Sequence, residues 1–194
     1  MLRSRTEVVM VEAVTVIMIL GGFGCVVVSI VYFSIANGIS PMPSTPKTVR
    51  AMIALLNEGE IGGQILELGS GWGHVAVALA MAFPSAKVVA IENSWIPFWV
   101  SWLLSGAGLR KNLSFQRADF YQFPLVEADV LVCYLFPGAM DRLQDKILRE
   151  CKDGCIIVSN TFAMPGWTAM RQIRLGGLWN THLYVYRVGE NRTE

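Results

Sequence analysis

The residues best suited to chemistry form a glycine-rich segment, Glu67–Gly73, which reads ELGSGWG and joins an apolar run to an Ala-rich run. Glycines at a strand-to-helix turn let the backbone approach a ligand closely, and the amides of a helix start favour a polar or anionic group. The spacing G-x-G-x-G followed by His74 differs from the dinucleotide pattern, and no Gly-Lys-Ser/Thr sequence follows. The segment therefore predicts a ligand-binding loop that is not a P-loop.

Two carboxylates follow this loop, each at the end of a predicted strand. Glu92 ends KVVAIE and Asp119 ends LSFQRAD. A carboxylate at the first position can accept hydrogen bonds from both hydroxyls of a ribose, and one at the second can accept a bond from an adenine amino group. Each carboxylate alone is a common solvated strand end, but Glu67, Glu92 and Asp119 in order predict a nucleoside site.

The elements that must position these residues alternate along the chain. A helix capped by Ser44 or Thr45 is predicted from Pro46. The other predicted helices are Val75–Phe83, Ile96–Ala107 and Met140–Cys151. The predicted strands are Gln64–Gly69, Lys87–Glu92, Leu113–Asp119, Ala128–Phe136, Cys155–Asn160, 168–175 and Thr181–Val188.

This alternation predicts an α/β fold: a mainly parallel sheet with helices on both faces, ended by an antiparallel hairpin around Gly176-Gly177. Ligands of such sheets bind outside the carboxyl ends of the strands. That edge would hold Gly69–Gly73, Glu92, Asp119 and Tyr134.

An uncharged stretch of 24 residues, Ala13–Ala36, precedes this domain. As a helix it would be about 36 Å long, enough to cross a hydrocarbon core of about 30 Å. The alternative is a cleaved signal peptide, whose apolar region is usually only ~7–15 residues and is followed by a small-residue cleavage site. We therefore predict a transmembrane anchor over 1–36, a Pro-rich linker over 37–46 and the α/β domain over 47–194.

The composition argues against several other classes. The 16 Lys and Arg residues nearly balance 15 Asp and Glu residues, so there is no basic excess to bind a nucleic acid. The four cysteines contain no CxxC pair and the two histidines are far apart, which predicts neither a metal site nor a disulfide scaffold. Basic residues flank the uncharged stretch on both sides, so charge does not set its orientation.

The sequence ELGSGWG, with Glu92 and Asp119 behind it, resembles the class I S-adenosylmethionine-dependent methyltransferases over residues 41–194. The resemblance implies a seven-stranded Rossmann-like sheet and S-adenosyl-L-methionine as the cofactor. It places the glycine loop on the methionine and ribose moieties, Glu67 at the methionine amino group, Glu92 at the ribose and Asp119 at the adenine.

A narrower resemblance is to the membrane-anchored protein-lysine methyltransferases that modify the c subunit of ATP synthase and the adenine nucleotide translocase. It rests on Pro41–Pro46, on Asn93–Trp99, on Asp119-Phe120-Tyr121 and on Pro165-Gly166-Trp167, with Ser94 where that subfamily has proline. The cofactor-binding residues it implies are Thr45, Glu67, Gly69, Ser70, Gly71, Trp72, Gly73, Glu92, Asn93, Asp119 and Phe120.

Three further features have more than one interpretation. Tyr134 is the candidate for orienting the methyl acceptor, or else an ordinary core or rim tyrosine. The resemblance suggests that Thr45 folds over the cofactor, whereas its position before Pro46 predicts a helix cap. Trp95, Trp99 and Trp102 share one helical face, which favours core packing over a substrate groove or a membrane surface.

These features predict a membrane-anchored enzyme that N-methylates lysine of a membrane protein, because tethering raises the effective concentration of a membrane substrate. The alternatives are a lipid, quinone or other apolar small molecule as acceptor, and a non-catalytic cofactor-binding scaffold. Since the cofactor is made in the cytosol, the catalytic domain is expected to face the cytoplasm.

Overall fold

The computed structural model describes residues 5–37, 42–59, 61–106, 110–176 and 180–190. The chain divides into two units, Met1–Ser40 and Pro41–Glu194. The first contains one helix, α1 (Arg5–Asn37). Within it, Val9–Ile35 is a candidate membrane span, and the 18 most apolar consecutive residues of this span have a mean hydropathy of 2.6 and include no buried residue. The predicted N-terminal helix is therefore present, with a length and composition sufficient to cross a bilayer.

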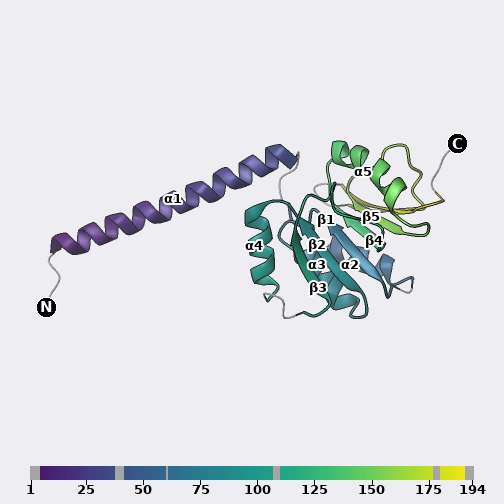
Figure 1. The fold of residues 1–194 in the computed structure, drawn as a ribbon, viewed down its shortest axis with the longest axis horizontal. Helices are drawn as coiled ribbons and strands as arrows, with labels where there is room; N and C mark the ends of the chain where they lie inside the picture. Colours follow the sequence, from purple (N-terminus) through teal and green to yellow (C-terminus); the bar gives the residue numbers. More distant parts are fainter. Residues whose placement is uncertain (1–4, 38–41, 60, 107–109, 177–179, 191–194) are drawn as a thin grey trace. The chain divides into compact units, whose positions relative to one another are not determined.

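The second unit is an α/β domain built on a seven-stranded sheet of order β3-β2-β1-β4-β5-β7-β6 (Figure 1). Strands β1 to β5 are parallel, and β7 is antiparallel to both β5 and β6. This is the predicted fold, including the terminal hairpin, although Gly177 lies outside the described residues. The elements are α2 (Pro46–Leu56), β1 (Gln64–Leu68), α3 (His74–Ala82), β2 (Lys87–Glu92), α4 (Trp95–Leu104), β3 (Leu113–Arg117), β4 (Ala128–Cys133), α5 (Pro137–Glu150), β5 (Ile156–Asn160), β6 (Arg171–Gly176) and β7 (Thr181–Arg187).

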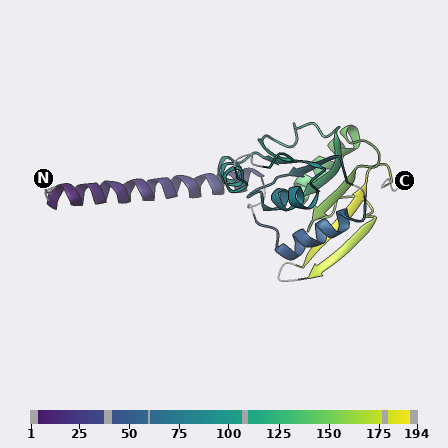
Figure 2. The ribbon, with the colours of Figure 1, turned by 90° about the horizontal axis from the view of Figure 1, so that it is seen from below.

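The side chains of the central strands alternate between two apolar cores. On β1, Leu66 and Leu68 pack with α5, whereas Ile65 packs with α2 and α3. Figure 2 shows α2 and α5 on opposite sides of the sheet. Because the central strands are buried on both faces, most of their residues are apolar, and polar residues lie mainly at their ends.

The start of α2 confirms the predicted cap. The hydroxyl oxygen of Thr45 accepts a hydrogen bond from the amide of Thr48 at 3.2 Å, and Pro46 occupies the first helical position. Proline is well suited to that position because its missing N–H would have no partner there.

Several predicted element ends were wrong, and two of them affect candidate site residues. Strand β3 ends at Arg117 and β4 at Cys133, so Asp119 and Tyr134 lie in the loops beyond. The carboxylate of Asp119 accepts a bond from the amide of Tyr121 at 2.9 Å, which turns the chain. Pro137 begins α5 earlier than predicted, because its fixed φ suits the first helical turn. The predicted end of α4 at Ala107 lies outside the described residues.

The expected core packing of the tryptophans on α4 was also wrong. Trp95, Trp99 and Trp102 are 49%, 51% and 37% exposed, and the residues of α4 that are buried are Pro97 and Ser101. The reason is a close helix contact, because a Cβ placed on Gly73 would lie only 2.6 Å from the Cβ of Ser101. No indole fits in that contact, so the large side chains point away from the sheet.

Candidate functional site

The segment after β1 is a tight loop that only glycine accommodates at its key positions. Gly69 and Gly73 have φ angles of +70° and +76°, in the left-handed region that disfavours other residues. The amides of Gly69 and Ser70 both donate to the carbonyl of Ile91 at 2.9 Å, which fastens the loop to the end of β2. A Cβ on Gly73 would also lie 2.7 Å from the ring of Phe115. The loop is therefore held rigidly before α3 begins.

The carboxylate of Glu92 connects this loop to the next one. One of its oxygens accepts a bond from the amide of Gly71 at 2.8 Å, and the other accepts a bond from the amide of Ser94 at 2.8 Å. The side chain is only 7% exposed. Carboxylates that accept backbone amides form charge-assisted bonds, which are stronger than neutral ones. Glu92 thus organises the loops after β1 and β2 and retains lone pairs for a ligand.

Glu67 is a buried carboxyl group at the carboxyl end of β1. Burial is the main cause that raises its pKa to about 8; the nearby charge of Glu92 adds to this, and a hydrogen bond from the amide of Ala76 opposes it. A carboxyl that is buried without a cation favours its protonated form. A ligand with a positive charge at this position would reverse that preference.

Unpaired polar atoms gather around the same loop. Among the residues that the structure describes, four buried side-chain atoms lack a hydrogen-bond partner, and three of them are Glu67 Oε2, Ser70 Oγ and His74 Nδ1. Buried polar groups in proteins are nearly always paired. Three exceptions within eight residues therefore leave several polar atoms at this loop that a polar ligand could pair.

The segment before α2 lies against this loop. The Nε2–H of His74 donates to the carbonyl of Ser44 at 3.1 Å, since a carbonyl can only accept. Burial lowers the pKa of His74, and the bond to Ser44 raises it less strongly. The side-chain amide of Asn160 donates to the hydroxyl of Ser44 at 3.0 Å. Thr45, which follows Ser44, is thereby brought to the same edge as the glycine loop.

Sequence reasoning missed Asn160, which is the last residue of β5 and only 2% exposed. Its carbonyl oxygen accepts a bond from the hydroxyl of Thr161 at 3.0 Å, and Thr161 has a φ of +71°. A β-branched residue in that conformation is strained, and such strain is concentrated at functional sites. The available signal was a polar residue at the end of an apolar strand, the same signal that identified Glu92.

The remaining predicted residues lie along the same edge. The carbonyl oxygen of the Asn93 side chain accepts a bond from the hydroxyl of Ser94 at 3.2 Å. The amide of Ala118, next to Asp119, donates to the carbonyl of Glu92 at 3.1 Å. Phe120 packs on the core beside α5, and Trp72 is partly buried within the glycine loop.

Tyr134 follows β4, the strand next to β1, and its ring stacks on that of Phe162 with centroids 6.0 Å apart. Phe162 was not predicted and comes from the loop after β5. The carboxyl edge therefore has two parts: acidic and glycine residues over β1 and β2, and aromatic residues with Asn160 over β4 and β5. The boundary between β1 and β4 is where successive connections run in opposite directions, the usual ligand crevice of such sheets.

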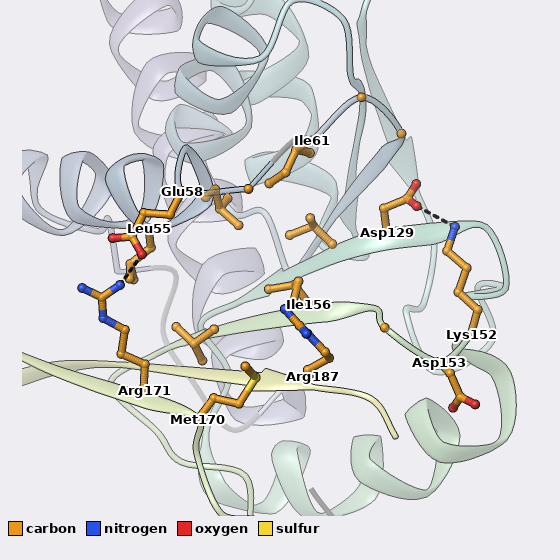
Figure 3. A pocket seen from close by; sticks show the side chains of 17 residues that line it. Leu55, Glu58, Ile61, Asp129, Lys152, Asp153, Ile156, Met170, Arg171 and Arg187 are labelled. Atoms are coloured by element: carbon orange, nitrogen blue, oxygen red, sulfur yellow. Dashed lines mark hydrogen bonds and ion pairs between the residues drawn. The ribbon is translucent and has the colours of Figure 1, made fainter. Parts of the chain in front are cut away.

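A cavity of about 630 Å³ lies at the opposite, amino-terminal edge of the parallel strands (Figure 3). Each cationic side chain that lines this cavity forms a salt bridge: Lys152 with Asp129, Arg171 with Glu58 and Arg187 with Glu190. It contains none of the predicted site residues. Within the described ranges, no three His, Cys, Asp or Glu side chains are grouped to bind a metal ion.

Comparison with known proteins identifies the same region. Residues 67–171, which include the glycine loop, Glu92 and Asp119, match the family model described as the ANTKMT methyltransferase domain. A protein-lysine N-methyltransferase of Saccharolobus islandicus is 27% identical over 155 residues, covering 78% of this chain and 94% of that protein.

Two further comparisons, with one curated protein and one solved structure, agree with this result. The adenine nucleotide translocase lysine N-methyltransferase of Mus musculus is 25% identical over 105 residues, which cover 54% of this chain but only 46% of that protein. The fold is that of an RNA methyltransferase from Salinibacter ruber crystallised with S-adenosyl-L-homocysteine, with a TM-score of 0.70 and 24% identity over 79% of this chain and 97% of that one.

Proposed function

The chain belongs to the family of ANTKMT methyltransferase domains, and we propose that it N-methylates a lysine of a membrane protein while anchored by α1. The observation that carries the proposal is the family match over residues 67–171. This range includes the carboxylates of Glu67, Glu92 and Asp119 and the rigid glycine loop. The relatives named for lysine methylation support the choice of acceptor.

The enzyme is a methyltransferase that uses S-adenosylmethionine, whose sulfonium supplies the transferable methyl group. The chain's own residues fit this cofactor. The unpaired oxygen of Glu67 suits a cationic amino group, and the free lone pairs of Glu92 suit ribose hydroxyls. We assign these two roles to them, and contact with the adenine to Asp119, Phe120 and Asn93. The glycine loop has no bulky side chains at its glycines, so its backbone amides can lie close to the cofactor.

The aromatic part of the edge suits the methyl acceptor. A lysine must lose a proton before it can attack a methyl group, and desolvation lowers the pKa of an amine because it disfavours the charged form. Tyr134 and Phe162 provide such a desolvating surface, and the phenol of Tyr134 can accept a hydrogen bond from the amine and orient it. Positioning of donor and acceptor then accounts for most of the rate increase.

Helix α1 is the reason for proposing that the methyl acceptor is a membrane protein. Val9–Ile35 has the length and apolarity of a single span, and tethering concentrates the enzyme near substrates in the same bilayer. Because S-adenosylmethionine is made in the cytosol, we propose that residues 41–194 face the cytoplasm. Protease added to inverted membrane vesicles should then remove this domain, and protection there would contradict the orientation.

The test of the function is transfer of a labelled methyl group from S-adenosylmethionine into membranes, followed by separation of protein from lipid. We expect label in protein, and at least about a tenfold loss with Tyr134→Phe, because that variant removes the hydrogen bond that orients the acceptor amine. Binding of S-adenosylhomocysteine should be unchanged in that variant. The matched control is Tyr184→Phe, which alters a partly buried tyrosine on β7 that stacks on His182. Label in the lipid fraction would contradict the lysine assignment.

A further inference from the structure

Helix α4 has an unusual distribution of exposed surface. Nine of its ten residues, WIPFWVSWLL, are apolar, yet Leu103 and Leu104 are 67% and 75% exposed, as well as the three tryptophans. Figure 1 shows α4 at the periphery of the α/β domain, beside β3. A helix that is apolar on all sides is normally buried in a protein core or in a membrane.

Two of the exposed tryptophans, Trp99 and Trp102, form an aromatic cluster with the partly exposed Phe98. The rings of Phe98 and Trp99 have centroids 5.5 Å apart, and those of Trp99 and Trp102 are 5.6 Å apart, both edge to face. An exposed apolar patch of this kind marks an interaction surface. Tryptophan in particular is enriched where a protein meets the boundary between lipid and water, because its ring is apolar and its N–H is polar.

Basic side chains accompany the cluster. The guanidinium of Arg117 lies 3.8 Å from the centroid of the Trp95 ring, and Arg110 and Lys111 are exposed just beyond the end of α4. Basic residues beside an apolar helical face are typical of helices that lie in the surface of a membrane with anionic lipids. Their charge favours anionic headgroups over a neutral protein surface.

The connection to α1 begins at the same edge of the domain as α4. The carbonyl of Ser44 accepts a hydrogen bond from His74, which directly follows the glycine loop. Helix α4 begins directly after Ser94, whose amide donates to the carboxylate of Glu92. Only residues 38–41 separate α1 from Met42, a length of chain that spans at most roughly 20 Å.

We propose that α4 is a membrane-docking helix, with Trp95, Trp99 and Trp102 in the interface of a bilayer that contains anionic lipid. Arg110, Lys111 and Arg117 then lie among the headgroups. This inference rests on the proposed anchoring by α1. Docking through α4 holds the carboxyl edge of the sheet beside the membrane. The favoured methyl acceptors are then lysines that lie close to the bilayer surface.

The experiment uses the full chain in vesicles of phosphatidylcholine and phosphatidylglycerol whose acyl chains carry bromine close to the headgroup. Bromine quenches tryptophan fluorescence on contact. Three of the six tryptophans are on α4, so roughly half of the emission should be quenched. The variant Trp99→Ser/Trp102→Ser should lose at least about half of that quenching, because it removes two of the three docked rings. The matched control is Leu148→Ser/Met170→Ser, which removes exposed apolar side chains outside α4 and should quench like the wild type.

Flotation of the vesicles separates the possible failures. If the protein floats with the vesicles but the wild type is not quenched, or the tryptophan variant is quenched as strongly, docking through α4 is overturned while the anchor stands. If the protein does not float, the proposed anchor fails and the docking with it. Binding of S-adenosylhomocysteine by each variant establishes that it is folded. Bromine at the ends of the acyl chains should quench less than bromine near the headgroup, and the reverse order would exclude an interfacial helix.

Discussion

Replacing Glu92 with glutamine should weaken S-adenosylhomocysteine binding by roughly 2 kcal/mol or more, about thirtyfold in Kd. The amide group of glutamine can accept only through its oxygen, so it cannot accept bonds from both Gly71 and Ser94 as the carboxylate does. The side chain is also only 7% exposed, so water cannot replace the lost bond easily. Calorimetric titration of the purified protein measures the effect.

The matched control for this change is Glu150→Gln. The carboxylate of Glu150 also accepts a backbone amide, that of Leu125 at 3.1 Å, but at the end of α5. We expect this variant to lose thermal stability and to bind S-adenosylhomocysteine like the wild type. Equal loss of affinity in both variants would show that Glu92 acts only through stability, and an unchanged affinity in Glu92→Gln would remove Glu92 from the site.

Replacing Glu67 with glutamine should change how the stability of the ligand-free protein depends on pH. The pKa of Glu67 is raised to about 8 in the folded state, from an ordinary value of 4.5 in the unfolded state. Between these values the folded state retains a proton that the unfolded state has released. Stability from this group is therefore fully present below about 4.5 and is lost as pH rises towards 8.

Glutamine resembles the protonated acid at every pH, so Glu67→Gln should match the wild type near pH 5 and melt at a higher temperature near pH 8. The same variant should bind S-adenosylhomocysteine at least about tenfold more weakly near pH 8, because it has no charge for the amino group of the ligand. Wild-type binding should release protons, which calorimetry in two buffers counts. A melting difference that is the same at both pH values would contradict the buried, protonated state of Glu67.

The sequence predicted the fold well because its strands are buried on both faces. In the strand Lys87–Glu92 the four residues Val88–Ile91 are apolar, so the position of Glu92 at the end of a strand could be predicted directly. The strong local signals were glycines in the loop, proline at the start of α2 and alternation of strands and helices. Each depends on neighbouring residues alone, which is the information that one sequence contains.

Features that depend on contacts between distant segments were not predictable in the same way. The bond between Asn160 and Ser44 joins residues 116 positions apart, and the two amide bonds of Glu92 require the loop after β1 to fold back on β2. The tryptophans of α4 show the same limit. Their spacing is that of a core helix, but the close contact of Gly73 with Ser101 turns them outward.

The most direct test of the central claim is mass spectrometry of lysine methylation in membranes from cells that contain either the wild-type chain or Glu92→Gln. We predict a membrane protein whose lysine is methylated with the wild type and unmethylated with the variant, at equal amounts of enzyme in the membrane. If the lysine methylation of membrane proteins is identical in the two samples while methylated lipid or RNA differs, methylation of a membrane-protein lysine is contradicted.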